Sequence, residues 1–278
     1  MSNKKNSNTK KRNDHKYTRF VSHREAAEAA ARIKTDAQGN RYVVRFSVAE
    51  RIEHALLIIS FTMLGLTGLL QRYADTALGE LLLKAMGGID VARQLHHIFA
   101  VMFFLEAVYH VGIFLYNLIV YRRIGSLWPN FEDIRHFGQV MRLNLGLSKE
   151  HPDFGRFNFE EKVEYWALIW GTVVMGLTGV MQWFPAFVTR WLPGSSIPVA
   201  RVLHSLEAVL AVLAILIWHM YHTVVKTVNK SIFTGIMTEE EMLEEHPAEL
   251  KYLERATAAL QKYKNTVLDE SKEKEGNL

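Results

Sequence analysis

The chain has 278 residues, no cysteine and a formal net charge of +4. The absence of cysteine excludes disulfides, iron–sulfur clusters, Cys-ligated zinc and covalently attached c-type haem from this chain, so a metal would be bound by His or carboxylate. Residues 1–46 are polar and basic, residues 230–278 are charged, and apolar residues concentrate between 47 and 229. We expect these three ranges to be an N-terminal extension, a membrane domain and a C-terminal helix with a tail.

Four segments of the membrane domain are long enough to cross a bilayer, which requires about 20 mostly apolar residues. They are Ala49–Leu70, Leu95–Tyr121, Val163–Trp183 and Val199–Val225. The shorter apolar stretch Ala77–Met86 is expected to be an interfacial helix. Residues 1–46 have no apolar core and are not expected to be a cleavable signal. The pattern predicts an all-α integral membrane protein with four transmembrane helices.

The positive charges follow the order of the spans. Lys and Arg are abundant before the first span, between the second and third, and after the fourth, but sparse in the other two loops. Cytoplasmic loops carry the excess of Lys and Arg. We therefore expect both the N-terminal and C-terminal extensions to be cytoplasmic. The basic charge is explained as a topology signal, and no recognition motif indicates nucleic acid as a partner.

The membrane domain contains an internal repeat. "ERIEHALLIISFTMLGLTGLLQ" begins at Glu50 and "EKVEYWALIWGTVVMGLTGVMQ" begins at Glu161, and each is followed by a second span that opens on Ala-Arg-x-Leu-His. The halves resemble two copies of a helical hairpin, and a pair of hairpins makes a four-helix bundle whose core can hold cofactors. The glycines of both copies allow helices to approach closely in lipid.

Several histidines lie within or beside the spans, where an ionisable side chain marks a functional site by default. His96 and His204 open the second and fourth spans at their outer ends. Neutral imidazole is a good iron ligand, and two histidines from two helices can hold haem axially. We predict that His96 and His204 are the axial ligands of an outer haem. Arg93 and Arg201, one turn outward, either pair with haem propionates or anchor the helix ends at the interface.

The ligands of a second, inner haem are less sharply indicated by periodicity. An α-helix rotates about 100° per residue, so from His204 the fifteen residues to His219 leave a rotation of about 60°, whereas the eighteen to His222 return to the same face. The fourteen residues from His96 to His110 fall about 40° short. Periodicity alone allows His110, His219 and His222, as well as His54 at the inner end of the first span.

The chain resembles the cytochrome b (gamma) subunits of membrane-bound formate dehydrogenases and the related b-type cytochromes of hydrogenases and thiosulfate reductases. The resemblance covers residues 45–250 and is carried by "RFSVAERIEHALLIISFTMLGLTGL", "ARQLHHIFAV", "GRFNFEEKVEYWALIWGTVVMGLTGVMQW", "VLHSLEAVLAVLAILIWHMYHTVVK" and "SIFTGIMTEEEMLEEHPAEL". It implies two haems b, an inner one on His54 and His219 and an outer one on His96 and His204.

Two departures from the family keep alternatives open. The family's spacing between its two fourth-span ligands is one residue shorter, which makes His222 a substitute for His219. His110 is additional, and its spacing from His96 resembles the cytochrome b of bc complexes, in which the second and fourth spans bind both haems. In that case His54 would not be a ligand.

The resemblance also implies an exchangeable quinone, menaquinone or ubiquinone, beside the inner haem, near an Asn and a Gln that precede the third span. Asn158 matches, and Glu161 stands at the Gln position. The Glu161 carboxylate either carries quinone protons or, like Glu160, stabilises the N-terminus of the helix.

The function expected from these features is a dihaem b-type cytochrome in the cytoplasmic (inner) membrane of a bacterium or archaeon. As the resemblance implies, it would pass electrons between quinone and an iron–sulfur subunit or multihaem cytochrome c, and through it a catalytic oxidoreductase subunit that holds the primary substrate site. The alternative is a proton-coupled transporter that uses intramembrane His residues, with the repeat as its symmetry.

The segments outside the spans give fewer indications. Arg19–Lys34 is expected to form a surface helix, and Ile236–Ala259 is an acidic, helix-prone stretch. The last ten residues are typical of a disordered tail. Five histidines outside the spans are expected to be solvated: His15, His23, His136, His151 and His246.

Overall fold

The computed structural model describes residues 23–120 and 125–276. The chain forms two compact units. One comprises residues 48–129 and 159–230, which contain all four candidate spans, and the other draws on residues 1–47, 130–158 and 231–278. Segments far apart in the sequence therefore share the second unit.

The spans of the membrane unit are three α-helices and one composite helix. They are α3 (Val48–Arg72), α5 (Ile89–Ile119), α7 (Phe159–Trp183) and the run Ser196–Lys226, which begins as α9 (Ser196–Leu213). All four are long and apolar enough to cross a membrane. The expectation of an all-α membrane protein with four spans is confirmed.

Large apolar side chains are exposed along all four helices. Ile58, Phe104, Leu177 and Leu210 are examples, one from each span. A contiguous apolar surface of this extent is not tolerated in water. It indicates that lipid covers the outer faces of the helices.

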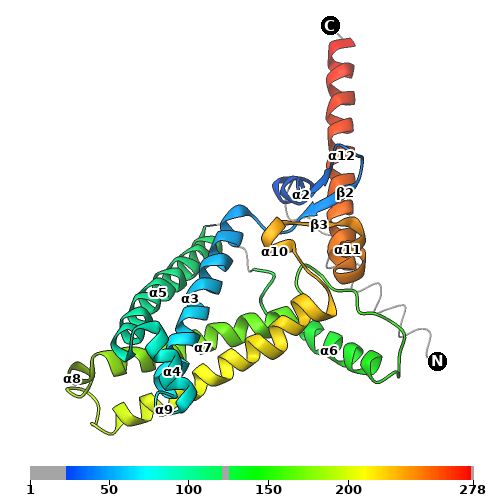
Figure 1. Ribbon diagram of the computed structural model, residues 1–278. Coiled ribbons are helices and arrows are strands. Elements are labelled where there is room, and N and C mark those ends of the chain that lie inside the picture. The colour runs from blue at the N-terminus through cyan, green and yellow to red at the C-terminus, as the bar shows by residue number, and fades with distance from the viewer. Residues whose placement is uncertain (1–22, 121–124, 277–278) are drawn as a thin grey trace. The chain divides into compact units, whose positions relative to one another are not determined.

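The helices are arranged as two hairpins. Helix α3 packs beside α5, and α7 packs beside α9, as Figure 1 shows. Helices α3 and α9 join the hairpins, and a Cβ atom on Gly65 would lie 3.1 Å from Val212, so glycine allows this close approach. The arrangement matches the internal repeat, one hairpin per copy.

Short helices follow the first span of each hairpin. Helix α4 (Ala77–Met86) has the bounds expected from the sequence, and α8 (Pro185–Val188) is a single turn. The Thr76 side chain accepts from the amide of Gly79 at the start of α4, and Gly87 ends the helix with φ of +100°. Both are ordinary stop and start signals, which is why the bounds of α4 could be predicted.

The fourth span changes from α-helix to π-helix near its C-terminal end. Helix α9 runs into η1 (Ala214–His219), and η2 (Tyr221–Lys226) follows after Met220. The i→i+5 hydrogen bonds of a π-helix hold one more residue per turn than the bonds of an α-helix. A spacing of fifteen residues from His204 to His219 therefore spans about as many turns as fourteen residues of α-helix.

The second unit is built around a three-stranded antiparallel sheet. Its strands β1 (Ile33–Thr35), β2 (Arg41–Val44) and β3 (Ile236–Thr238) lie in that order, with Val43 opposite Met237. Helices of this unit are α2 (His23–Ala30), α6 (Phe131–Asn144), α10 (Ser231–Thr234), α11 (Glu239–Glu245) and α12 (Pro247–Gly276). Its core contains Val43, Met237, Met242 and Leu253.

Several expectations for this unit need correction. The surface helix expected at Arg19–Lys34 is shorter and ends before β1, although residues 19–22 lie outside the described residues. The tail expected to be disordered is helical as far as Gly276. His136 and His246 are buried rather than solvated, whereas His151 is exposed. His15 and the side chain of His23 lie outside the described part of the chain.

Candidate functional site: paired histidines in the bundle

The outer pair consists of His96 on α5 and His204 on α9. The centroids of their imidazole rings lie 6.3 Å apart, and the rings are inclined at 69°. The two residues occupy the same place in the two copies of the repeat, so each hairpin contributes one member of the pair.

Two threonines of the repeated Gly-Leu-Thr-Gly sequence determine which ring nitrogen of each outer histidine carries the proton. The Thr67 hydroxyl lies 2.6 Å from a backbone carbonyl four residues earlier and 2.9 Å from His96 Nδ1. Thr178 repeats both distances with its own carbonyl and His204 Nδ1. A hydroxyl donates one proton, and the carbonyl can only accept it. Each hydroxyl oxygen therefore accepts from Nδ1–H, which leaves Nε2 unprotonated.

The glycine after each threonine makes room for the histidine ring. A Cβ atom on Gly68 would lie 3.2 Å from His96 Cε1, and one on Gly179 would lie 3.3 Å from His204 Cε1. Both distances are too close for an ordinary contact, so any side chain at these positions would push the ring. Each outer histidine is thus held by a threonine at Nδ1 and by the following glycine, which leaves room for Cε1.

The inner pair consists of His54 on α3 and His219 at the end of η1. Their ring centroids lie 6.4 Å apart, inclined at 39°. His219 Nδ1 lies 2.8 Å from a carboxylate oxygen of Glu164 on α7. A carboxylate accepts the Nδ1 proton, so Nε2 is the nitrogen of His219 that a neutral ring offers to a metal.

His110 is occupied by other partners. Its Nδ1 contacts the Glu53 carboxylate, and its Nε2 lies 2.9 Å from the Tyr165 hydroxyl. The carboxylate accepts the Nδ1 proton, and the hydroxyl then donates to Nε2. This histidine has no ring nitrogen left for a metal in the arrangement that the structure describes.

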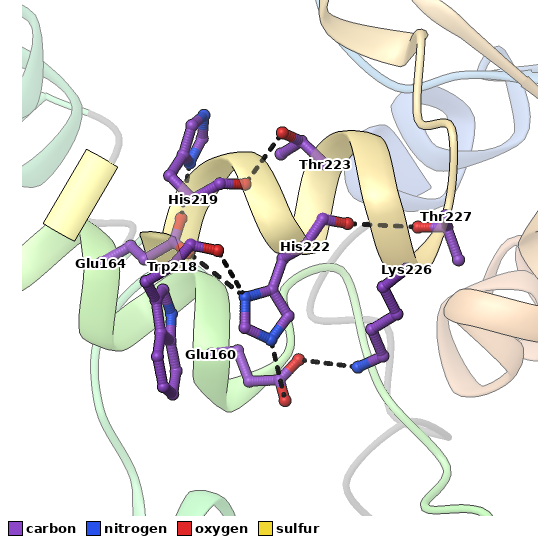
Figure 2. A network of polar contacts seen from close by, with 8 residues as sticks. All are labelled: Glu160, Glu164, Trp218, His219, His222, Thr223, Lys226 and Thr227. Carbon is purple, nitrogen blue, oxygen red and sulfur yellow. Dashed lines mark hydrogen bonds and ion pairs between the residues drawn. The ribbon is translucent and has the colours of Figure 1, made fainter. Parts of the chain in front are cut away.

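The ring of His222 points away from the ring of His219, as Figure 2 shows. Its Nδ1 lies 2.8 Å from the carbonyl oxygen of Trp218, and its Nε2 lies at an ion-pair distance of 3.5 Å from Glu160. The Glu160 carboxylate, which is buried, is also 3.2 Å from Lys226 Nζ. Both nitrogens of His222 therefore face acceptor oxygens in the described structure.

The two histidine pairs fit a planar cofactor with one axial ligand on each face. With about 2 Å from each Nε2 to a metal and about 1 Å from Nε2 to the ring centre, the centroids would be about 6 Å apart. The centroid distances of 6.3 and 6.4 Å agree with this separation. Among residues 23–120 and 125–276 no group of three or more His, Cys, Asp or Glu could hold a metal ion. Two histidines on opposite sides match the axial ligands of haem, whose macrocycle supplies the remaining iron ligands.

The other residues singled out from the sequence lie as follows. Arg93 is exposed and donates to Asp90 at 3.1 Å, and Arg201 is exposed on the first part of α9. Asn158 is half-buried directly before α7, and Glu161 is half-buried in the first turn of that helix. Neither arginine contacts the outer histidines in the described structure.

Some site residues were missed by sequence reasoning. The repeated Gly-Leu-Thr-Gly was read only as a helix contact, yet its threonines bond both outer histidines. The second Glu of each repeat, Glu53 or Glu164, contacts a histidine, and the repeat carried this signal as well. Arg72 also contacts Ser205, next to His204, and nothing in the pattern of the sequence indicated that contact.

Four apolar spans that bring two pairs of histidines close together define a class, the membrane-embedded helical bundles with paired histidines between their helices. The sequence model of the prokaryotic cytochrome b561 family matches residues 45–238. The chain belongs to this family. Membership implies b-type haem and a role in electron transfer within the membrane.

Curated relatives agree with the family. The chain is 29% identical over 222 residues to the cytochrome b556(fdo) subunit of formate dehydrogenase from Escherichia coli (strain K12), covering 77% of this chain and 95% of the relative. It is 24% identical over 220 residues to the nitrate-inducible cytochrome b556(Fdn) subunit of the same organism, covering 79% and 95%. A formate dehydrogenase cytochrome b556 subunit from Haemophilus influenzae (strain ATCC 51907 / DSM 11121 / KW20 / Rd) is 27% identical over 218 residues, covering 77% and 84%. The resemblance found in the sequence is confirmed.

Proposed function

We propose that the chain is a dihaem cytochrome b, the membrane electron-transfer subunit of a respiratory oxidoreductase complex of the formate dehydrogenase kind. The observation that carries the proposal is the presence of two histidine pairs with centroid separations of 6.3 and 6.4 Å at opposite ends of the spans. His96 and His204 hold the outer haem, and His54 and His219 hold the inner one. The names of the curated relatives support the formate dehydrogenase assignment.

Each haem supplies one-electron redox chemistry when bound. The protein residues hold and orient it. The fifteen positions between His204 and His219 correspond to about 20 Å along the helix, so the two pairs serve opposite halves of the bilayer. The Thr67 and Thr178 hydroxyls fix the tautomer of the outer ligands, and the apolar side chains of the spans keep water away from both pairs.

Electrons pass between a periplasmic or extrinsic redox subunit on the outer side and quinone on the inner side. The partner is an iron–sulfur subunit or a multihaem cytochrome c attached to the catalytic subunit. Asn158 and Glu161 bind the quinone, and the Glu161 carboxylate exchanges protons between quinone and water. Arg93 and Arg201 pair with the propionates of the outer haem.

The test is the haem content of the purified full-length protein, from a reduced-minus-oxidised spectrum and a pyridine haemochrome titration. We expect two b haems per chain. His96→Ala, His204→Ala, His54→Ala and His219→Ala should each retain one haem. His110→Ala and His222→Ala serve as matched controls from the same spans and should retain two.

Other outcomes would change the assignment. Loss of one haem in His110→Ala, with two retained in His54→Ala, would move the inner site to the second and fourth spans. A wild-type protein without haem would contradict the cytochrome function and favour the proton-coupled transporter.

A further inference from the structure

The two halves of the bundle contain equivalent carboxylate–imidazole pairs. Glu53 and Glu164 hold the same place in the two copies of the repeat, and each contacts Nδ1 of a histidine near the inner end of a neighbouring helix. The histidines correspond as well, because His110 lies fourteen residues after His96, and the π-helical segment makes the fifteen residues from His204 to His219 equivalent to that spacing.

The two pairs differ in what faces the other ring nitrogen. His110 Nε2 accepts from the hydroxyl of Tyr165, whose place in the repeat is that of His54. The ring of His219 faces His54 itself at 6.4 Å, the separation of a bis-histidine site. In one copy of the repeat the histidine of the carboxylate–imidazole pair contacts a tyrosine. In the other copy that histidine belongs to the inner pair.

The Glu164 carboxylate is directed at His219. Its Oε2 lies 2.8 Å from His219 Nδ1, and its Oε1 is buried with no hydrogen-bond partner among the described residues. The nearby ammonium of Lys226 is 3.2 Å from Glu160 and does not neutralise Glu164, and His222 Nδ1 lies 3.9 Å from Glu164 Oε1 (Figure 2). The shortest contact of the Glu164 carboxylate among the described residues is therefore the one with His219.

The outer pair has neutral partners instead. His96 and His204 both donate Nδ1–H to threonine hydroxyls. A carboxylate acceptor makes a ligating imidazole more basic than a hydroxyl does, and hydrogen bonds to charged groups are the stronger ones. A more basic ligand, with a negative charge behind it, stabilises ferric over ferrous iron.

We propose that Glu164 is a positioning residue that orients His219 and lowers the reduction potential of the inner haem. The inference rests on the proposed function, because it takes His219 as an axial ligand. The two sites then differ in how the protein sets the reduction potential of the haem. A carboxylate accepts the Nδ1 proton of His219 at the inner site, whereas hydroxyls accept it at the outer site.

The test is a spectroscopic redox titration of the haem-loaded, full-length protein, with electron paramagnetic resonance of the two ferric signals. In Glu164→Gln we expect two haems per chain and a higher midpoint potential for the inner haem alone. The expected shift corresponds to at least a tenfold change in the ferric/ferrous ratio, about 59 mV for one electron. The signal of the inner ferric haem should move and that of the outer haem should not.

Glu53→Gln is the matched control. It removes one negative charge from the equivalent place in the repeat but leaves the proposed ligand's hydrogen bond intact. We expect less than a threefold change in the same ratio, so the difference between the variants measures the hydrogen bond to His219. Equal shifts in both variants, or no shift in Glu164→Gln, would overturn the proposal.

Glu164→Asp covers the case in which Glu164→Gln fails to load the inner haem. The aspartate keeps the charge, and we expect it to retain both haems with a midpoint closer to the wild type. Equal loss of the inner haem in both variants would show a packing role and overturn the inference. A wild-type chain without haem would instead contradict the proposed function, and the two failures are therefore distinguishable.

Discussion

Gly68 and Gly179 lie against the rings of the outer histidines, where each is the residue that follows a histidine-bonding threonine. The space that these glycines leave is taken by Cε1 of His96 and of His204. A methyl group at either position would require the imidazole to shift by a few tenths of an ångström. Axial ligation depends on the direction of Nε2, so a substitution that changes the orientation of the ring would weaken it.

Gly179→Ala should therefore weaken the outer haem site. We expect a 10- to 100-fold lower haem affinity there, the range found when the support of a metal ligand is disturbed, with the inner site unaffected. Titration of the haem-free protein with haem, followed in the visible spectrum, measures both affinities. Gly176→Ala is the control, because a Cβ atom there would meet nothing within 4 Å. Equal losses in the two variants would point to general damage to α7.

At the scale of the elements, the apolar segments predicted the four spans and α4. The spans are long, continuous apolar runs, and α4 begins and ends at ordinary helix signals. The π-helical end of the fourth span could not be predicted, since i→i+5 bonding leaves no mark in the sequence. Counting along an ideal α-helix gives a rotation of about 60° from His204 to His219, and this count does not apply where the span becomes π-helical.

The sheet of the second unit was missed for a different reason. Its strands have three or four residues, too few to show alternation, and β2 pairs with β3 across almost the whole chain. Sequence distance therefore hid the sheet. The burial of His246 was missed as well, because its imidazole contacts the Gly155 carbonyl, which is remote in the sequence.

His246 makes the stability of the second unit dependent on pH. Burial, and next the charge of Arg45, lower the pKa of His246 to about 3, against the opposing effects of the Gly155 carbonyl and Glu249. In the unfolded chain this histidine takes up its proton near the ordinary histidine pKa of 6.5. Between these pH values the unfolded state binds more protons, so stability is lost as the pH falls, by up to about 1.4 kcal/mol per pH unit.

Hydrogen exchange of the α12 amides, corrected for intrinsic rates, measures this dependence. Protection should fall from pH 6.5 towards acid in the wild type and much less steeply in His246→Gln, whose amide can still donate to the Gly155 carbonyl. His151→Gln, at an exposed histidine, should behave like the wild type. A slope unchanged in His246→Gln would assign the acid sensitivity to other groups.

At the scale of the whole molecule, both histidine pairs join the two hairpins. His54 and His96 come from the first hairpin, and His204 and His219 come from the fourth span of the second. The number of haems that double variants retain tests which histidines form each pair. His204→Ala/His219→Ala removes one ligand from each proposed site and should leave no bis-histidine haem.

His54→Ala/His219→Ala removes both ligands of one proposed site and should leave one haem per chain. The pyridine haemochrome titration measures both variants, and each has the same number of histidines removed. One haem in the first double variant, or none in the second, would require a different pairing of the ligands.

The position of both second ligands on the last span also sets the order of biogenesis. A nascent chain whose first three spans have entered the membrane possesses only His54 and His96 of the proposed ligands, one for each site. Neither site is complete until His204, and then His219, has been inserted. For the proposed ligands, two-sided ligation of either haem can therefore be completed only after the fourth span has entered the membrane.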